Sequence, residues 1–246
     1  MSGSRIKSLL SKGVESLLSV VVPDICPICG KTMVGGESFI CFECRLSAPY
    51  TEQWKRRENI FEQRFWGVVP ICRASAFMWF VEGSCWVKII HDMKYHSLSV
   101  FAKNMGRWYA AMLSETDFLD GVDLIVPVPL YWIRRLTRGY NQSEYIAAGI
   151  SEYTSIPCCF NAVRRVANNP SQTHVKSGDR WDNVEDIFSV IHPEKLRSHH
   201  ILIVDDVLTT GATIISLATK ITDACCGDVT ISVATLAASK KQFGVE

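Results

Sequence analysis

The sequence has almost no excess of charge of either sign. Its 246 residues include 26 lysines and arginines and 25 aspartates and glutamates, which leaves a formal net charge of +1. A protein that coats nucleic acid by bulk charge needs a strong basic excess, so this class is excluded, although local basic patches are still allowed.

The sequence also lacks an uninterrupted apolar run that could span a bilayer. Apolar residues recur at helical spacing from Ile6 to Val21, but Lys7, Lys12 and Glu15 interrupt them. A membrane-spanning helix needs about 20 consecutive apolar residues. We therefore expect a short amphipathic helix that packs on its own protein rather than a membrane anchor. No secretory signal, internal repeat or low-complexity segment is visible, and we expect a cytoplasmic protein without membrane insertion.

The length and composition allow one mid-sized domain with a small appendage, because 48% of the residues are hydrophobic. We expect an N-terminal helix and four-cysteine ribbon over residues 1–50, a linker over 51–66 and a main domain over 67–246. The ten cysteines do not indicate a disulfide framework, since four form two Cys-x-x-Cys pairs and the others lie in apolar surroundings, as small core residues do in a reducing compartment.

The N-terminal cysteines have the spacing of a metal site. "CPICG" contains Cys26 and Cys29, "CFEC" contains Cys41 and Cys44, and eleven residues separate the two pairs. Two such turns bring four sulfurs to one ion, and the glycines between them suit a tight hairpin. We predict a structural Zn²⁺ with no open coordination position. A redox dithiol or an iron–sulfur site is the alternative.

Cations alternate with aromatic residues in the segment "WKRRENIFEQRFWG", residues 54–67. Such a mixture suits single-stranded nucleic acid, because guanidinium groups meet phosphates and rings stack on bases. The alternative is an amphipathic linker whose aromatic residues dock on the main domain, and we favour it because an aromatic stripe is usually core.

From about residue 67 the sequence alternates between strand-like and helix-like segments. Strands are expected over 66–79, 122–130, 186–191, 199–206 and 229–237, and helices over 84–95, 97–115, 141–153 and 213–226. This alternation predicts an α/β fold with a doubly wound, mostly parallel sheet. Sheets of this kind carry their sites at the carboxyl ends of the strands.

The stretch "ILIVDDVLTTGAT", residues 201–213, has the pattern of a ligand site. Asp205 and Asp206 follow the apolar strand "ILIV", and "LTTGAT" forms the turn into the next helix. Backbone N–H groups at a helix N-terminus and threonine hydroxyls suit a phosphate, whereas two carboxylates suit a sugar diol or a metal ion. Phosphate and diol together indicate ribose 5-phosphate. A helix N-cap with an acidic turn is the alternative.

A basic segment, "RRLTRGYNQ" at residues 134–142, places three arginines before a glycine and a polar pair that opens a helix. Three cations before a helix N-terminus can form a phosphate or pyrophosphate clamp. A solvated basic loop, with Asn141 as the helix cap, accounts for the same residues equally well.

These motifs resemble two known patterns. The stretch 201–213 resembles the phosphoribosyl-pyrophosphate (PRPP) motif of type I phosphoribosyltransferases. The sequence also resembles the ComF competence-protein family. The resemblance rests on the four-cysteine ribbon and on "HDMKY" (91–95), "VPVPL" (126–130), "RRLTRGYNQ" and "SQTHVKSGDRWDNV" (171–184). The resemblance covers nearly the whole chain in the family's order. It implies a type I phosphoribosyltransferase fold joined to a zinc ribbon, and an association with DNA uptake in natural transformation.

The resemblance also implies site residues. It assigns Asp205 and Asp206 to the ribose hydroxyls and a Mg²⁺ ion, and Lys94 to the pyrophosphate side, as the catalytic set. The implied ligand-binding residues are Thr209, Thr210, Gly211, Ala212, Thr213, Arg138, Asn141, Gln142, Gln172, Arg180 and Asn183. His174 stands where the family often has glycine, so a family-typical acceptor is not assumed.

Three functions fit these residues. A phosphoribosyltransferase would bind Mg²⁺ and PRPP and release pyrophosphate when an acceptor attacks C1 of the ribose. Asp206, His174 or the substrate itself would act as the base. The sequence leaves open whether the chain catalyses this reaction. A non-catalytic competence factor would hold single-stranded DNA at the same site, with basic segments 55–73 and 134–138 extending the track. A regulator would sense PRPP and act through the zinc ribbon.

Overall fold

The computed structural model describes residues 24–93, 98–167 and 187–245. The chain divides into two compact units, Met1–Ala48 and Pro49–Glu246. The helix expected near the N-terminus lies outside the described residues. Within the described ranges, no helix is both long enough and apolar enough to cross a membrane.

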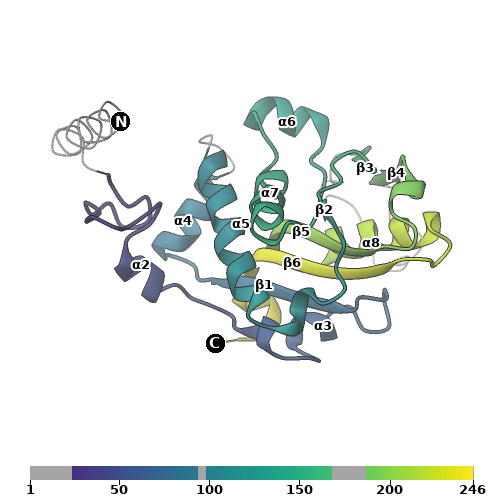
Figure 1. Cartoon of the computed structure of the whole chain (residues 1–246), viewed down its shortest axis with the longest axis horizontal. Coiled ribbons are helices and arrows are strands. Elements are labelled where there is room, and N and C mark those ends of the chain that lie inside the picture. Colours follow the sequence, from purple (N-terminus) through teal and green to yellow (C-terminus); the bar gives the residue numbers. More distant parts are fainter. Residues whose placement is uncertain (1–23, 94–97, 168–186, 246) are drawn as a thin grey trace, which may run out of the picture. The chain divides into compact units, whose positions relative to one another are not determined.

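The second unit is built around a four-stranded sheet in which every pair is parallel. Figure 1 shows the strands in their spatial order, β1 (Arg73–Phe80), β6 (Thr230–Ser239), β5 (His200–Leu208) and β2 (Leu124–Pro127). Because the connections between parallel strands must cross over the sheet, helices are required on its faces.

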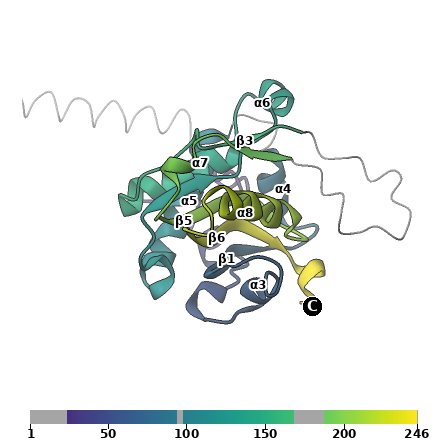
Figure 2. The same cartoon turned by 90° about the vertical axis from the view of Figure 1, so that its right-hand side faces the viewer.

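Alternate strand residues face two helical layers. On one face, Phe77 of β1 stacks on Tyr109 of α5 (Ser99–Ser114), with ring centroids 4.8 Å apart. On the other face, its neighbour Ala76 belongs to a core cluster that includes residues of α3 (Ile60–Gln63) and α8 (Ala212–Ala224; Figure 2). The predicted α/β class with a doubly wound, mostly parallel sheet is therefore confirmed.

Two parts of the second unit differ from the pattern expected of the sequence. A short helix, α6 (Trp132–Arg138), forms where a basic loop was one alternative, and none of its residues is buried. The strand expected over 186–191 is β4 (Phe188–Val190), which pairs antiparallel with β3 (Val163–Arg165) in a separate sheet. Three-residue strands and a helix without a buried face leave no readable hydrophobic period. Of the helices, α4 (Cys85–Asp92) and α7 (Gln142–Thr154) lie close to their expected limits.

Two glycines allow α5 and α7 to approach closely. A Cβ atom at Gly106 would lie 2.1 Å from the carbonyl oxygen of Ile146, and one at Gly149 would lie 2.0 Å from the carbonyl oxygen of Lys103. Both clashes are with backbone, which cannot turn aside as a side chain can, so only glycine fits at these positions. This contact fixes α7, whose first turn reaches the candidate site.

The segment expected as a linker, residues 51–66, lies within the second unit. Trp54, Phe61 and Phe65 are buried there, whereas Trp66 is exposed. The structure therefore agrees with the alternative in which these aromatic residues dock on the main domain. Three of the four rings are unavailable for stacking on bases.

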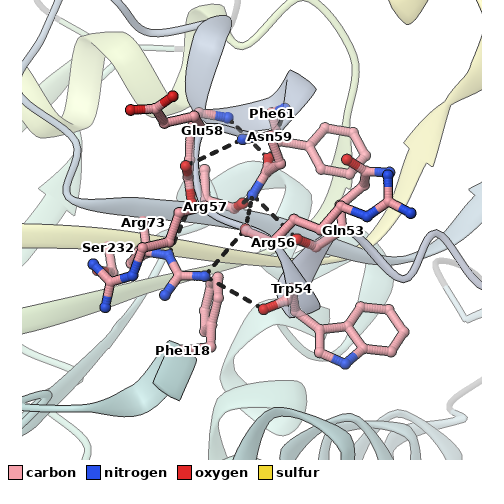
Figure 3. A network of polar contacts seen from close by, with 12 residues as sticks. Gln53, Trp54, Arg56, Arg57, Glu58, Asn59, Phe61, Arg73, Phe118 and Ser232 are labelled. Carbon is pink, nitrogen blue, oxygen red and sulfur yellow. Dashed lines mark hydrogen bonds and ion pairs between the residues drawn. The ribbon is translucent and has the colours of Figure 1, made fainter. Parts of the chain in front are cut away.

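Arg73 of β1 fastens this segment to the sheet. Its Nε donates a hydrogen bond to Glu62 Oε1 at 2.9 Å, and its Nη1 donates to Asp117 Oδ1 at 2.9 Å. Nη2 donates to the carbonyl oxygens of Trp54 at 3.4 Å and Arg56 at 3.2 Å (Figure 3). The guanidinium is therefore paired on all sides, as a buried charge must be.

Candidate metal centre and ligand site

The first unit brings four cysteine sulfurs together. The Sγ atoms that lie within 4.8 Å of one another are those of Cys26, Cys29, Cys41 and Cys44. Gly30, at φ +75°, closes the first turn by donating its amide to the carbonyl oxygen of Cys26 at 2.8 Å. The second pair lies at the start of α2 (Phe42–Leu46), which Cys41 caps. The short turns thus place the thiols as their spacing predicts.

The ionisation of these thiols is divided unevenly. Burial raises the pKa of Cys26, but hydrogen bonds from the amides of Cys41, Cys29 and Ile28 outweigh burial and lower the pKa to about 7. Burial and the neighbouring thiols raise the pKa of Cys44. A thiolate at one cysteine therefore disfavours ionisation of the neighbouring thiols, and a bound cation removes this effect. Four close sulfur donors fit a tetrahedral Zn²⁺ with no position left open.

In the second unit, Asp205 and Asp206 lie inside β5. The strand was expected over 199–206, but its pairing with β6 continues to Leu208. On the other side, β2 pairs only as far as Pro127, opposite Val204. The continuing partner strand is the reason for this longer end, because cross-strand pairing overrides the weak strand propensity of aspartate. Both acids therefore lie just beyond the end of β2.

The carboxylate of Asp205 is held by two donors. Its Oδ1 accepts a hydrogen bond from the hydroxyl of Ser143 at 3.0 Å and from the backbone amide of Asp206 at 2.9 Å. Ser143 is buried in the first turn of α7. The sequence did not single it out, because a serine in a first helical turn looks like an ordinary capping residue.

The turn after β5 leads directly into α8. Gly211 is the N-cap of α8 at φ +84°, and Thr210 Oγ1 accepts a hydrogen bond from the amide of Ala212 at 3.4 Å. Thr209 and Thr210 are exposed. The first amides of a helix have no partner within the helix, so this turn offers donors to an anion.

The segment expected as a linker supports this turn from outside. Arg64 Nε donates to the carbonyl oxygen of Thr210 at 2.8 Å. A Cβ atom at Gly211 would lie 3.3 Å from the ring of Phe65. Sequence reasoning missed this support, since Arg64 and Thr210 are 146 residues apart.

Six of the predicted site residues line one polar cavity of about 150 Å³. They are Arg138, Asn141, Gln142, Asp205, Asp206 and Thr213. Arg134, from the basic segment, and Arg165, which the sequence did not single out, line the same cavity. The structure thus brings together the acidic pair, the end of the threonine turn and three arginines.

Two of the predicted ligand-binding residues also hold the walls of this cavity. Asn141 Nδ2 donates to the carbonyl oxygen of Val128 at 3.0 Å, and Asn141 Oδ1 accepts from the amide of Ser143 at 3.2 Å as the cap of α7. Gln142 Nε2 donates to the carbonyl oxygen of Met93 at 3.1 Å. The capping role expected for Asn141 is therefore present, whatever it does for a ligand.

The other predicted residues cannot be placed. Lys94, Gln172, Arg180 and Asn183 lie outside the described residues, as does His174. Their part in the site stays a prediction.

A second cavity, of about 380 Å³, adjoins the first and shares Pro129, Leu130 and Arg165 with it. Its lining includes Trp132 and Phe160, which are 59% and 52% exposed. Arg135 also lines this second cavity, and its Nη1 pairs with Glu144 Oε1 at 3.0 Å. The arginines of α6 are thus divided between the two cavities.

No family model matches the chain. The chain is similar to Competence protein F of Haemophilus influenzae, with 36% identity over 101 residues, which cover 41% of this chain and 44% of that protein. It is similar to DNA utilization protein YhgH of Salmonella typhi, with 29% identity over 197 residues, 79% of this chain and 76% of that protein. These relatives confirm the resemblance to the ComF family.

The share of each relative that is matched varies. The chain spans less than half of the Haemophilus protein, at 44%, and 58% of the YhgH protein of Escherichia coli K12, to which it is 29% identical over 133 residues, 53% of this chain. The relatives' activities and partners are therefore not transferred with the family resemblance.

Two solved structures show a weaker likeness. One is the allosteric regulatory enzyme of purine biosynthesis, with 18% identity and a TM-score of 0.39 over 58% of this chain and 30% of that one. The other is the glutamine PRPP amidotransferase from B. subtilis, with 19% identity and a TM-score of 0.40 over 59% and 30%. Because both TM-scores lie below 0.5, no conclusion rests on these two structures.

Proposed function

We propose that the polar cavity at the end of β5 binds PRPP or a related ribose 5-phosphate ligand, and that the chain is a phosphoribosyltransferase-like protein. The observation that carries the proposal is the convergence of Asp205, Asp206 and Thr213 on one polar cavity. This cavity lies near the carboxyl ends of β5 and β2, where parallel sheets hold their ligands.

Each part of the site suits one part of such a ligand. The amides at the start of α8, with the hydroxyls of Thr209, Thr210 and Thr213, suit the 5-phosphate. The carboxylates of Asp205 and Asp206 suit the ribose hydroxyls, and Ser143 orients the first of them. Mg²⁺ bound with the ligand would neutralise diphosphate charge, and the same two carboxylates are the oxygen donors that would hold it.

We also propose a role in DNA uptake. The support is the naming of the relatives, which are called Competence protein F and DNA utilization protein YhgH. Ligand binding and DNA uptake are separate parts of the proposal, and each can fail alone.

Thermal unfolding with and without Mg-PRPP tests the ligand. At a ligand concentration of about 100 times Kd, a real site adds about 2.7 kcal/mol to the free energy of unfolding. The shift should disappear in Asp205→Asn/Asp206→Asn and persist in Asp120→Asn/Asp223→Asn, which removes the same charge from positions outside the cavity. Absence of a shift in the unaltered chain, or an equal shift in both double variants, contradicts the proposal.

Turnover needs its own measurement. If the chain is an enzyme, it releases pyrophosphate from Mg-PRPP when a nitrogenous base is added as acceptor. A chain that binds Mg-PRPP through Asp205 and Asp206 but releases no pyrophosphate with any base is a binding protein or a sensor.

Single-stranded DNA binding is a second candidate function, and the second cavity favours it. Exposed Trp132 and Phe160 offer rings for stacking beside the cation of Arg135. Affinity for an oligonucleotide should fall steeply with salt and fall further in Trp132→Ala/Phe160→Ala. Binding that ignores both the salt concentration and the double variant would remove this candidate.

A further inference from the structure

The turn between β5 and α8 contains a peptide whose orientation the turn itself does not determine. The peptide joins Thr210 to Gly211, it is trans, and Gly211 lies at φ +84°. Glycine adopts positive and negative φ about equally well, so no Cβ atom prevents a flip of this peptide. Because the C=O and N–H of a trans peptide point in opposite directions, the direction of the Thr210 carbonyl decides where the Gly211 amide points.

Arg64 holds this carbonyl by a hydrogen bond. Its Nε donates to the carbonyl oxygen of Thr210 at 2.8 Å. The stem of the same side chain lies against Gly211, since a Cβ atom there would be 3.6 Å from Arg64 Cγ. Within the part of the chain that the structure describes, the Gly211 amide has no hydrogen-bond partner. The carbonyl is therefore turned toward Arg64, and the amide points to the opposite side of the peptide as an unused donor.

The backbone that carries Arg64 is itself fixed. Arg64 follows α3, in which the N-cap Asn59 and the third residue Glu62 exchange side-chain-to-backbone hydrogen bonds. Its neighbour Phe65 is fully buried. The guanidinium carbon of Arg64 lies 6.0 Å from the centre of the Phe243 ring. An arginine whose backbone and stem are already held loses less conformational freedom when it makes its hydrogen bond.

We infer that Arg64 is a positioning residue for an anion bound at this turn, because it directs the Gly211 amide toward the ligand. The ligand rests on the proposed function, in which the anion is the 5-phosphate of a ribose 5-phosphate. An N–H group aimed at a phosphate oxygen stabilises the anion, whereas a flipped peptide would present the partial negative charge of the Thr210 carbonyl. Arg64 thus acts through the backbone of the turn.

Two neutral variants separate the hydrogen bond of Arg64 from its charge. Arg64→Gln keeps an N–H donor the same number of bonds from Cα as Arg64 Nε, whereas Arg64→Met places a methyl group there. Both remove the positive charge, so a difference between them reports the hydrogen bond to Thr210. Arg56→Met is the control, because Arg56 is an exposed arginine of the same segment whose backbone, rather than whose side chain, contacts Arg73.

Calorimetric titration of ribose 5-phosphate into the zinc-loaded full chain measures the effect. Arg64→Met should weaken binding by about tenfold, because the Gly211 amide is no longer held toward the phosphate. Arg64→Gln should stay within about threefold of the unaltered chain, and Arg56→Met within about twofold, since exposed charges are screened. Equal affinities in Arg64→Met and Arg64→Gln overturn the positioning role.

The Gly211 amide gives a readout that a purely structural role of Arg64 would not move. Saturating ribose 5-phosphate should shift the Gly211 amide proton downfield in the unaltered chain and in Arg64→Gln, and by less in Arg64→Met, because an N–H that faces the phosphate donates to it. Without ligand, ¹⁵N relaxation dispersion at Gly211 should appear in Arg64→Met alone, as the released peptide exchanges between two orientations. Identical Gly211 signals in Arg64→Met and the unaltered chain overturn the inference.

The outcomes also separate this inference from the proposed function. Ribose 5-phosphate binding that is equal in all variants overturns the role of Arg64 and leaves the proposed function standing. If the unaltered chain does not bind ribose 5-phosphate, the proposed function fails, and relaxation dispersion at Gly211 still decides whether Arg64 fixes the peptide.

Discussion

Arg73 and Arg165 are both more than nine-tenths buried on β-strands, at 4% and 8% exposure, but their electrostatic surroundings are opposite. Burial lowers the pKa of Arg73, yet hydrogen bonds to Asp117 and Glu62 outweigh burial and raise it. For Arg165, repulsion from Arg134 adds to the lowering by burial, and Asp205 acts in the opposite direction. Arg73 is compensated by two acids of its own chain, whereas Arg165 shares its cavity with two further arginines and with the carboxylates of Asp205 and Asp206.

This difference separates a charge that the fold itself neutralises from one that lies among other cations. Compensation within the chain lets Arg73 fasten the segment 53–62 to the sheet without any ligand (Figure 3). Like charges that gather around a cavity weaken the fold slightly, and a bound ion of the opposite sign would relieve their repulsion. The four thiols of the first unit are comparable, because negative thiolates gather there and a cation would relieve their repulsion.

Zinc removal should give the largest effect, because the thiol cluster depends on a cation that the chain does not supply. A structural zinc site contributes about 10–16 kcal/mol. A chelator should therefore abolish amide hydrogen-exchange protection over residues 24–48 and leave it intact in β5 and β6. Cys41→Ser should reproduce the loss, and Cys72→Ser, at an exposed cysteine outside the cluster, should not. Protection of residues 24–48 that survives chelation would contradict a structural metal.

Replacing each buried arginine tests the comparison directly. Arg73→Met should lower the free energy of unfolding by about 3–5 kcal/mol, because Glu62 and Asp117 lose their cation. Arg165→Met should cost no more than about 1 kcal/mol, since the loss of packing on Phe188 is offset by the removal of repulsion. Urea unfolding measures both. If both variants lower the free energy of unfolding by the same amount, the contrast between the two arginines is wrong.

Ser143→Ala tests the hydrogen bond that holds Asp205 in the polar cavity. The hydroxyl donates to Asp205, so its loss should cost about 1 kcal/mol and weaken stabilisation by Mg-PRPP. Ser114→Ala, at the exposed end of α5, serves as the control and should change neither quantity. A loss of stability with full retention of the ligand effect would make Ser143 a purely structural residue.

The pH dependence of the Arg73 network should be the smallest effect. Hydrogen bonds from Arg73 and Arg57 lower the pKa of Asp117 below its ordinary value of 3.8. A lowered pKa means that this carboxylate stabilises the fold above that value, and that the contribution is lost as pH falls below it. Asp117→Asn should flatten urea stability between about pH 5 and pH 2. The change is small because the side chain is 44% exposed.

Asp120→Asn is the matched control for that measurement, because Asp120 is an acid that follows the same turn. It should leave the pH dependence as it is. If both variants flatten the curve equally, general charge and not the contact with Arg73 is responsible.

Long elements with a clear period were predictable, and short ones were not. The helices α5, α7 and α8 follow their expected ranges within a few residues because each buries a full apolar face. The strand β3 has three residues, and the extension of β5 beyond Asp206 to Leu208 depends on its partner β6. Pairing with a distant strand leaves no mark in the local pattern.

By itself, the sequence determined the groups that short backbone turns bring together. The two Cys-x-x-Cys turns place their own sulfurs, and the stretch 205–213 carries its acids and its turn into α8 together. Only the tertiary structure determined the partners of each arginine. It pairs Arg73 with Glu62, directs Arg135 to Glu144, and brings Arg165 to Arg134. Short turns have few conformations, whereas contacts between distant residues depend on how the sheet and its helices pack.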